Sequence, residues 1–158
     1  MEKRGSLPRK LLQSELHKGD EKVNDPIFVD TNVFLRFFVR DSESFYQKAM
    51  ELFEKTEKGQ VKLETSDLVI AEIVWVMESY YGFSRSEIKE VVETILETKN
   101  LKVANHSRVK GAIDLYSAGK MDFIDACNIA YIKSKDYKKV ATFDIKHFKN
   151  IEGVSNIW

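Results

Sequence analysis

The sequence predicts an α/β domain in which a parallel sheet is covered by helices on both faces. Short apolar or alternating segments at residues 27–29, 61–65, 101–104 and 139–142 are typical of strands. Between them, apolar residues recur at the three- and four-residue spacing of helices. Because this order alternates strands with helices, it favours parallel pairing with the helices packed on the sheet. No internal repeat or low-complexity segment breaks the pattern.

The first strand is expected at residues 27–29, where an apolar run stops at Asp30. A run that is apolar at every position is typical of a strand buried on both faces. A brief helix through residues 34–38 follows. A longer helix then closes at Lys58-Gly59, and its apolar positions recur at helical spacing: Phe45, Ala49, Leu52 and Phe53.

The middle of the chain repeats this order. Residues 61–65 alternate as a strand does, and Ser66 is expected to cap the apolar helix that ends near Gly82. Ser84 and Glu87 form a capping box ahead of the next helix. Both helices carry several apolar residues and are expected to pack in the core: Leu68, Val69, Ile70, Ile73, Val76, Met77, Ile88, Val91, Val92, Ile95 and Leu96.

The last third predicts a strand at 101–104, a helix closed by Gly119, and a largely buried helix through residues 123–132. A strand at 139–142 follows, and residues 154–158 are expected to form an edge strand. In such sheets, ligands bind beyond the carboxyl ends of the strands. Functional side chains are therefore sought at those ends.

Composition limits the function classes. The 158 residues suit one domain, and 25 basic residues balance 25 acidic ones, unlike a strongly basic nucleic-acid binder. Any nucleic acid must be held by a local patch or through a metal. The chain has a single cysteine, Cys127, so it cannot form an internal disulfide, which fits a reducing, cytoplasmic setting. The sequence also lacks the cluster of Cys and His residues that would indicate a zinc site. No apolar run approaches the length of a membrane span.

Residues 1–25 differ from the rest, since they are polar, charged and interrupted by Gly and Pro. We expect a flexible leader here, or residues that precede a translation start at Val23, with the domain proper at 26–158. Two alternatives stay open. One is a docked helix through Leu11, Leu12 and Leu16. The other is an extension that binds a partner or nucleic acid through its basic residues, Lys3, Arg4, Arg9 and Lys10.

Two aspartates lie at strand ends. Asp30 directly follows the first strand, and Asp144 lies two residues beyond the strand at 139–142. The carboxyl ends of parallel strands meet at one rim of the sheet, so both carboxylates are expected there. Taken singly, each could instead be an ordinary turn or cap residue.

Two further acids interrupt apolar helices. Glu72 has apolar neighbours on both sides in the second turn of its helix, and a buried glutamate requires a partner. Asp125 lies in a similar context, one turn after Asp122, which is itself typical of an N-cap or first-turn acid. The simpler alternative for Glu72 is a place on the one wet stripe of its helix.

As a set, these four carboxylates point to a metal site. Unit charges 4 Å apart repel by about 4 kcal/mol at an effective dielectric near 20, so a converging cluster requires protons or a cation. Oxygen ligands favour Mg²⁺ or Mn²⁺. A carboxylate-held ion of this kind suits attack of an activated water on a phosphodiester.

The same segments resemble those of the PIN-domain nucleases, and the short chain looks most like the VapC-type toxins of prokaryotic toxin–antitoxin pairs. The likeness extends from about Ile27 to Trp158, and its motifs are weak singly but fairly specific in this order. The segments that carry it are Ile27-Phe28-Val29-Asp30-Thr31-Asn32, Ala71-Glu72-Ile73-Val74-Trp75-Val76, Asp122-Phe123-Ile124-Asp125-Ala126 and Ala141-Thr142-Phe143-Asp144.

This resemblance implies a three-layer α/β/α fold with a five-stranded parallel sheet. It implies Mg²⁺- or Mn²⁺-dependent endoribonuclease activity on RNA, a homodimer, and inhibition by a cognate antitoxin. The four family acids correspond to Asp30, Glu72, Asp125 and Asp144. Asn32 and Thr142 match polar residues that hold the first and last acids, and Asp122 matches an accessory acid of some members. The leader is a departure, because such toxins usually begin just before the first strand.

Other function classes fit less well. Haloacid-dehalogenase-like phosphatases need a second aspartate two residues after the first, where this chain has Asn32. A receiver domain needs a lysine directly after an apolar strand, and Lys146 is not so placed. A PIN ribonuclease of RNA processing, or a catalytically silent PIN-like interaction module, remains an alternative.

Two surface features are expected to serve partners. Basic residues close to Asp30 and Asp144 could bind phosphates, although an ordinary solvated surface explains them equally: Arg36, Arg40, Lys146, His147 and Lys149. Aromatic residues exceed what one small core needs, so some are expected at a homodimer contact or an antitoxin groove: Phe34, Phe37, Phe38, Tyr46, Trp75, Tyr80 and Tyr81.

Overall fold

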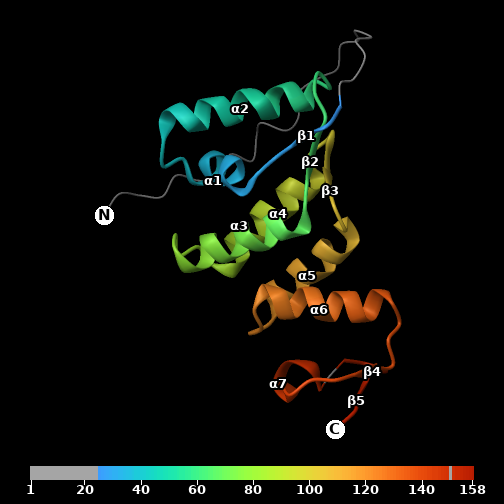
Figure 1. The fold of residues 1–158 in the computed structure, drawn as a ribbon. Coiled ribbons are helices and arrows are strands. Elements are labelled where there is room, and N and C mark those ends of the chain that lie inside the picture. Colours follow the sequence, from blue (N-terminus) through green and yellow to red (C-terminus); the bar gives the residue numbers. More distant parts are fainter. Residues whose placement is uncertain (1–24, 150) are drawn as a thin grey trace.

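The structure of this chain is a computed structural model that describes residues 25–149 and 151–158. The expected leader up to residue 24, and the expected start at Val23, lie outside these ranges. Helices and strands alternate along the described chain (Figure 1). The elements are β1 (Ile27–Phe28), α1 (Thr31–Val39), α2 (Glu43–Glu57), β2 (Leu63–Thr65), α3 (Asp67–Ser79), α4 (Arg85–Glu97), β3 (Leu101–Val103), α5 (His106–Ala118), α6 (Phe123–Ser134), β4 (Lys139–Val140), α7 (Ile145–Phe148) and β5 (Ser155–Asn156).

Local signals in the sequence account for most of these boundaries. The Ser66 hydroxyl accepts a hydrogen bond from the Val69 backbone N–H and begins α3. Ser84 and Glu87 form the predicted capping box at α4. Gly59, with φ of +72°, follows α2 in a left-handed conformation that glycine adopts without strain. Helix α5 ends at Ala118, directly before Gly119.

All observed strand pairs are parallel, as predicted, but the strands form two sheets. Strands β1, β2 and β3 form one sheet in that order, with Ile27 opposite Leu63 and Leu63 opposite Leu101. Strands β4 and β5 pair with each other, with Lys139 opposite Ser155. The single five-stranded sheet is therefore not observed among the described residues. The reason is that β1 has a hydrogen-bonded neighbour only on its β2 side.

The same arrangement overturns an expectation about the first strand. Ile27 is 44% exposed and Phe28 is 60% exposed, and only Val29 is buried. An apolar run was interpreted as a strand covered on both faces, but β1 is an edge strand here. Similarly, Ile124 of α6 is 56% exposed, so this helix is less buried than its sequence indicated.

The core lies around α3, which packs against α1, α4, α5 and α6. Ile70, Ile73 and Met77 are completely buried on its inner face, together with Ile88 of α4 and Ile113 of α5. Its outer face is exposed and apolar in part, since Leu68 is 77% and Trp75 67% exposed. Within the described residues, no helix is both long and apolar enough to cross a membrane.

Most of the aromatic residues that seemed in excess serve the core between α1 and α2. Phe34 and Tyr46 are buried, and the Phe37 ring packs edge-on to Phe38 and Phe53. Trp75 and Tyr80 are the exposed members of the predicted set. This small helical layer therefore uses most of these aromatics for packing, and the expectation of surface contacts depends on Trp75 and Tyr80.

Strands β4 and β5, with α7, form a C-terminal unit that packs on α6. Figure 1 shows this unit on the far side of α6 from the three-stranded sheet. A small second core of Ile129, Phe148 and Ile151 joins it to α6, with Leu115 of α5 packed alongside. The two sheets therefore lie on opposite sides of α6.

Candidate metal centre

The first predicted acid, Asp30, begins α1. Its Oδ2 atom lies 3.5 Å from both the backbone N–H and the side-chain amide of Asn32. An N-cap carboxylate also gains from the positive end of the helix dipole. Asn32 thus lies where sequence reasoning expected a residue that holds Asp30.

Glu72, the second acid, is on α3 and reaches the start of α1. The Thr31 hydroxyl donates a hydrogen bond to Glu72 Oε2. Thr31 itself is 3% exposed, whereas Glu72 is an exposed residue of α3. Sequence reasoning did not assign Thr31 a role. The available signal was its position directly after Asp30, which brings its hydroxyl to the same helix terminus.

Asp125, the third acid, lies in the first turn of α6. Asp122 caps this helix by accepting a hydrogen bond from the Asp125 backbone N–H at 2.8 Å. Burial, followed by the charges of Asp122 and Asp144, raises the pKa of the Asp125 carboxyl above its ordinary value. The site therefore disfavours a negative charge on Asp125 unless a positive group lies beside it.

Asp144, the fourth acid, begins α7 in the loop after β4. Its backbone N–H donates to the Thr142 hydroxyl at 3.0 Å. Thr142 is in turn held by Asn156 of β5, whose side chain exchanges two hydrogen bonds with the Thr142 backbone at 2.9 and 3.2 Å. Hydrogen bonds from His147 lower the pKa of the Asp144 carboxyl. Asn156 is a support for Asp144 that sequence reasoning missed.

His147 joins the third and fourth acids. Its Nδ1 atom lies 2.7 Å from Asp144 Oδ2 and 3.2 Å from Asp125 Oδ2. One ligand atom from each of these three residues lies within 4.8 Å of the other two. Sequence reasoning placed His147 on an RNA-binding rim instead. The three side chains form what is called the Asp125–Asp144–His147 group below.

Among the described residues, the side chains that could share one ion are those of the Asp125–Asp144–His147 group, which does not include Asp30 or Glu72. The contact between Thr31 and Glu72 instead links α3 to the start of α1, where Asp30 lies. The physical reason is the divided sheet. Because β4 pairs with β5 but not with β1 among the described residues, the carboxyl ends of β1 and β4 do not belong to one sheet.

The basic residues expected at the rim differ in their surroundings. The Arg36 guanidinium donates to Asp41, and the Arg40 guanidinium carbon lies 3.8 Å from the centre of the Tyr46 ring. Both arginine side chains thus contact residues of α2 or of the loop between α1 and α2. Lys146 and Lys149 are exposed on either side of His147 and lie near the Asp125–Asp144–His147 group.

The donor set fits a divalent metal ion. Asp125 and Asp144 supply carboxylate oxygens, and His147 supplies an imidazole nitrogen, which together suit Mn²⁺ and related ions. Burial, and after it the charges of Asp122 and Asp144, raises the pKa of the Asp125 carboxyl, so this carboxylate is costly without a positive group beside it. A cation at this point would relieve that repulsion.

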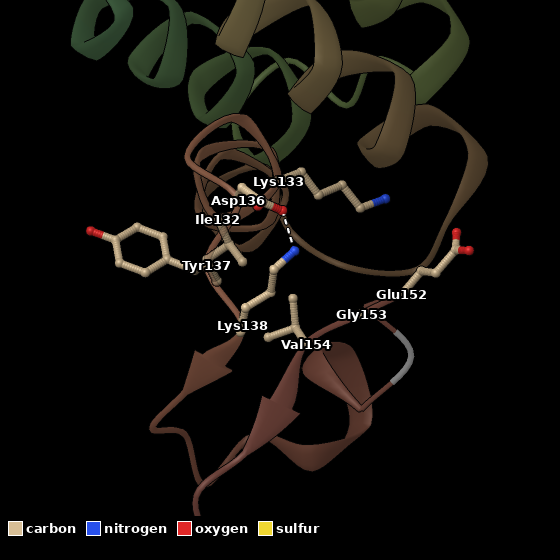
Figure 2. A pocket seen from close by; sticks show the side chains of 8 residues that line it. All are labelled: Ile132, Lys133, Asp136, Tyr137, Lys138, Glu152, Gly153 and Val154. Atoms are coloured by element: carbon tan, nitrogen blue, oxygen red, sulfur yellow. Dashed lines mark hydrogen bonds and ion pairs between the residues drawn. The ribbon is translucent and has the colours of Figure 1, made fainter.

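Two other polar features lie away from this centre. A cavity of about 250 Å³ is lined by residues that precede β4 and β5, among them Lys138 and Val154 (Figure 2). It opens at the amino ends of these strands, whereas Asp144 follows the carboxyl end of β4.

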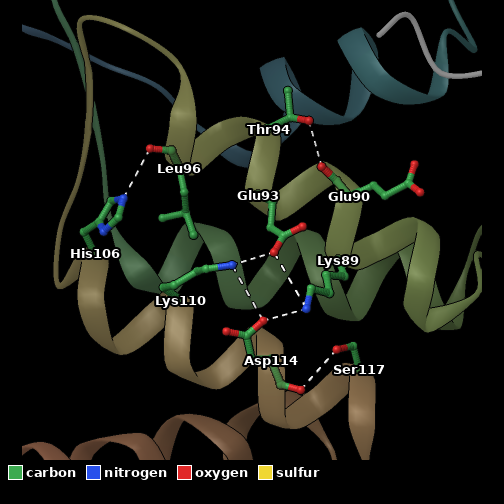
Figure 3. A network of polar contacts seen from close by, with 9 residues as sticks. All are labelled: Lys89, Glu90, Glu93, Thr94, Leu96, His106, Lys110, Asp114 and Ser117. Carbon is green, nitrogen blue, oxygen red and sulfur yellow. Dashed lines mark hydrogen bonds and ion pairs between the residues drawn. The ribbon is translucent and has the colours of Figure 1, made fainter.

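Figure 3 shows a network in which Lys89 and Lys110 contact Glu93 and Asp114. This network joins α4 to α5 and has balanced charges, which indicates a structural role.

Comparison with known proteins identifies the family of the chain. The PIN domain model matches residues 27–154. The VapC ribonuclease of Aquifex aeolicus (strain VF5) is 32% identical over 123 residues, which cover 78% of this chain and 90% of that protein. No solved structure matches the chain at a significant level. The chain therefore belongs to the PIN-domain family and is a VapC-like member of it.

Proposed function

We propose that this chain is a Mg²⁺- or Mn²⁺-dependent endoribonuclease that hydrolyses RNA phosphodiester bonds and acts as the toxin of a toxin–antitoxin pair. The observation that carries the proposal is the Asp125–Asp144–His147 group beyond the carboxyl end of β4. The similarity to a VapC ribonuclease supports the substrate class. The second pair of acids, Asp30 and Glu72, supports a larger site, because Thr31 already links their two helices.

The four acids have distinct proposed roles. Asp30, Asp125 and Asp144 hold the ion, and Glu72 orients the attacking water. When bound, the ion supplies an activated water and neutralises charge on the scissile phosphate. Asp122 keeps Asp125 in place through the α6 cap, and Thr142 does the same for Asp144. Asn32 does so for Asp30.

The complete site requires β1 and β4 to lie side by side, and we propose that they do so in the active enzyme. Both strands have an edge without a sheet neighbour among the described residues. On the β1 edge, Ile27 and Phe28 expose apolar side chains that a further strand would cover. Pairing there would join the two sheets into the five-stranded parallel sheet that the family resemblance implies. It would also bring Asp30 to the rim that carries Asp144.

Cleavage assays test the activity. We expect the parent to cleave RNA with Mg²⁺ or Mn²⁺ and to stop when the ions are chelated. Cleavage should fall at least about a hundredfold in each of Asp30→Asn, Asp125→Asn and Asp144→Asn. Losing a residue that only supports a metal ligand already lowers activity about 10–100-fold, and losing the ligand itself should cost more. Asp136→Asn is the matched control, since Asp136 is exposed and pairs with Lys138 before β4. Full activity in Asp125→Asn would refute the assignment.

A double-mutant cycle tests whether β1 and β4 come together. Mn²⁺ affinity is measured for Asp30→Asn, Asp144→Asn and the double variant. Residues further apart than about 7–10 Å give additive effects, whereas two ligands of one ion do not. We expect strong non-additivity. Additive losses would show that Asp30 and Asp144 belong to separate sites.

The proposed partners are RNA, a cognate antitoxin and a second copy of the chain, in the cytoplasm. An antitoxin arginine or lysine would suit the acidic group. The exposed Leu68 and Trp75 on α3 favour a homodimer contact. Lys146 and Lys149 are the best-placed phosphate-binding residues, with Arg36 and Arg40 as further members. Removing the two lysines should weaken RNA binding and flatten its salt dependence.

A further inference from the structure

We propose that His147 is a direct metal ligand and that its nitrogen makes this site prefer Mn²⁺ over Mg²⁺. The inference deepens the proposed function, on which it rests, by adding a residue and an ion preference to the acidic site. It starts from the juxtaposition of one imidazole nitrogen with carboxylates from two different helices, Asp125 of α6 and Asp144 of α7.

Local structure explains one of these contacts but not the other. Asp144 begins α7, and the His147 backbone N–H donates to Asp144 Oδ1 at 3.1 Å, as in a helix cap. The contact of Nδ1 with Asp144 Oδ2 follows from the same turn of chain. The approach of Nδ1 to Asp125 Oδ2 at 3.2 Å does not, because Asp125 comes from α6, more than twenty residues earlier.

The spacing of the three ligand atoms suits one ion. Adjacent ligands of an octahedral ion with bonds of about 2.1 Å lie about 3.0 Å apart. The distances from Nδ1 to the two carboxylate oxygens, 2.7 and 3.2 Å, bracket that value. Nδ1 donates its proton to Asp144 in this structure, and we propose that the ion takes the place of that proton between the imidazole and the two carboxylates.

The surroundings of the ring favour this role over RNA binding. The Nε2 atom is buried and has no hydrogen-bond partner among the described residues, and the side chain as a whole is 21% exposed. Nδ1 faces the two carboxylates. Neither ring nitrogen is therefore presented to a phosphate in solvent, whereas the neighbouring Lys146 and Lys149 are exposed.

The imidazole determines which ion the site prefers. Mg²⁺ binds oxygen ligands and retains much of its water, so a nitrogen donor adds little to its affinity. Imidazole is a better ligand for first-row transition ions. A site made of carboxylates alone would distinguish the two ions less. His147 is therefore expected to contribute to Mn²⁺ affinity and hardly to Mg²⁺ affinity.

The full chain loaded with Mn²⁺ alone provides the test. Pulsed electron paramagnetic resonance of the parent should show modulation from a directly bound imidazole nitrogen, and His147→Gln should lose it. By calorimetry, His147→Gln should weaken Mn²⁺ binding about tenfold or more, while Mg²⁺ binding changes less than about twofold. His106→Gln is the matched control, because the His106 ring contacts the Leu96 carbonyl (Figure 3) and does not belong to the Asp125–Asp144–His147 group. His106→Gln should leave the nitrogen modulation and the affinities for both ions unchanged.

Several results would overturn the inference. If the spectrum of the Mn²⁺-loaded parent shows no nitrogen modulation, the inference is refuted. This measurement uses no variant, so it holds even if His147→Gln does not fold. Equal weakening of both ions, or tighter Mn²⁺ binding without the imidazole, would also refute it. If the parent still cleaves RNA and Asp125→Asn does not, only the role of His147 has failed. If the parent binds neither ion, the proposed function fails as well.

Discussion

Replacing Arg85 should lower the stability of this protein, because its side chain holds the turn that precedes α6. Arg85 is the first residue of α4, and its Nη1 atom donates to the backbone carbonyls of Tyr116, Gly119 and Met121 at 3.0, 3.1 and 2.6 Å. These carbonyls belong to the end of α5 and the turn before α6. One guanidinium thereby holds the turn that leads to Asp122.

The size of this loss in unfolding free energy follows from the number of protons that the Arg85 guanidinium donates and from how exposed its contacts are. Nη1 carries two protons for three carbonyls, so two full charge-assisted hydrogen bonds are counted, at about 1.5 kcal/mol each. The guanidinium also lies 4.3 Å from the centre of the Tyr116 ring, which adds about 0.5 kcal/mol. The ion pair with Glu78 is partly exposed and contributes little. Arg85→Ala should therefore lower the free energy of unfolding by about 3–4 kcal/mol.

Urea denaturation followed by circular dichroism measures this loss, with calorimetry as a second method. At about 3–4 °C per kcal/mol for a domain of this size, the melting temperature should fall by about 10–15 °C. Arg85→Lys keeps the charge but lacks the planar fork, so it should recover part of the loss. Glu78→Gln is the control and should cost less than about 1 kcal/mol. A loss below about 1 kcal/mol in Arg85→Ala would refute the account of the turn.

Three smaller predictions follow from other contacts. The buried Tyr116 hydroxyl makes no hydrogen bond of good geometry among the described residues, and burial, followed by the charge of Glu78, raises its pKa, so Tyr116→Phe should leave stability unchanged or raise it by up to about 1 kcal/mol in urea denaturation. The hydrogen bond from Lys89 lowers the pKa of Asp114 below its ordinary 3.8. After solvent screening, this contact should add less than about 1 kcal/mol to the free energy of unfolding. That stability should be complete above about pH 5 and be lost as the pH falls through the lowered pKa of Asp114. Asp114→Asn should remove this pH dependence of stability, and an unchanged pH profile in the variant would contradict the prediction. Trp75→Ser should convert a dimer to a monomer in sedimentation velocity with little change in secondary structure, and a persistent dimer would exclude this face of α3.

Local features of this protein could be predicted because they depend on neighbours along the chain. The Ser66 cap, the Ser84–Glu87 capping box and the end of α5 at Gly119 follow from side chains that satisfy backbone groups within one helical turn. Asp30 and Asp144 were predicted as acids that follow strands, and each also caps a helix, which was the alternative that their local sequence left open. The parallel direction of the strands could also be inferred, since helices separate them in the sequence.

Long-range relations could not be obtained in this way. No local pattern determines whether β4, which pairs with β5, also pairs with β1, because backbone hydrogen bonds between strands do not depend on which strand supplies them. That choice decides the exposure of Ile27 and Phe28 and the separation of Asp30 from Asp144. The burial of aromatics between α1 and α2 is also a matter of packing, since Phe37 looks the same in sequence whether it meets Phe53 or solvent.

For this protein, the sequence by itself determined the α/β class, the helix termini, the PIN-type order of acids and the residues that carry it. Only the tertiary structure decided that His147 lies between Asp125 and Asp144, that Thr31 reaches Glu72, and that Arg85 holds the turn before α6. The physical reason is the range of the interactions. Caps and helical periodicity act over a few residues of one chain segment, whereas these three contacts join helices far apart in sequence, and packing of the whole chain sets their distances.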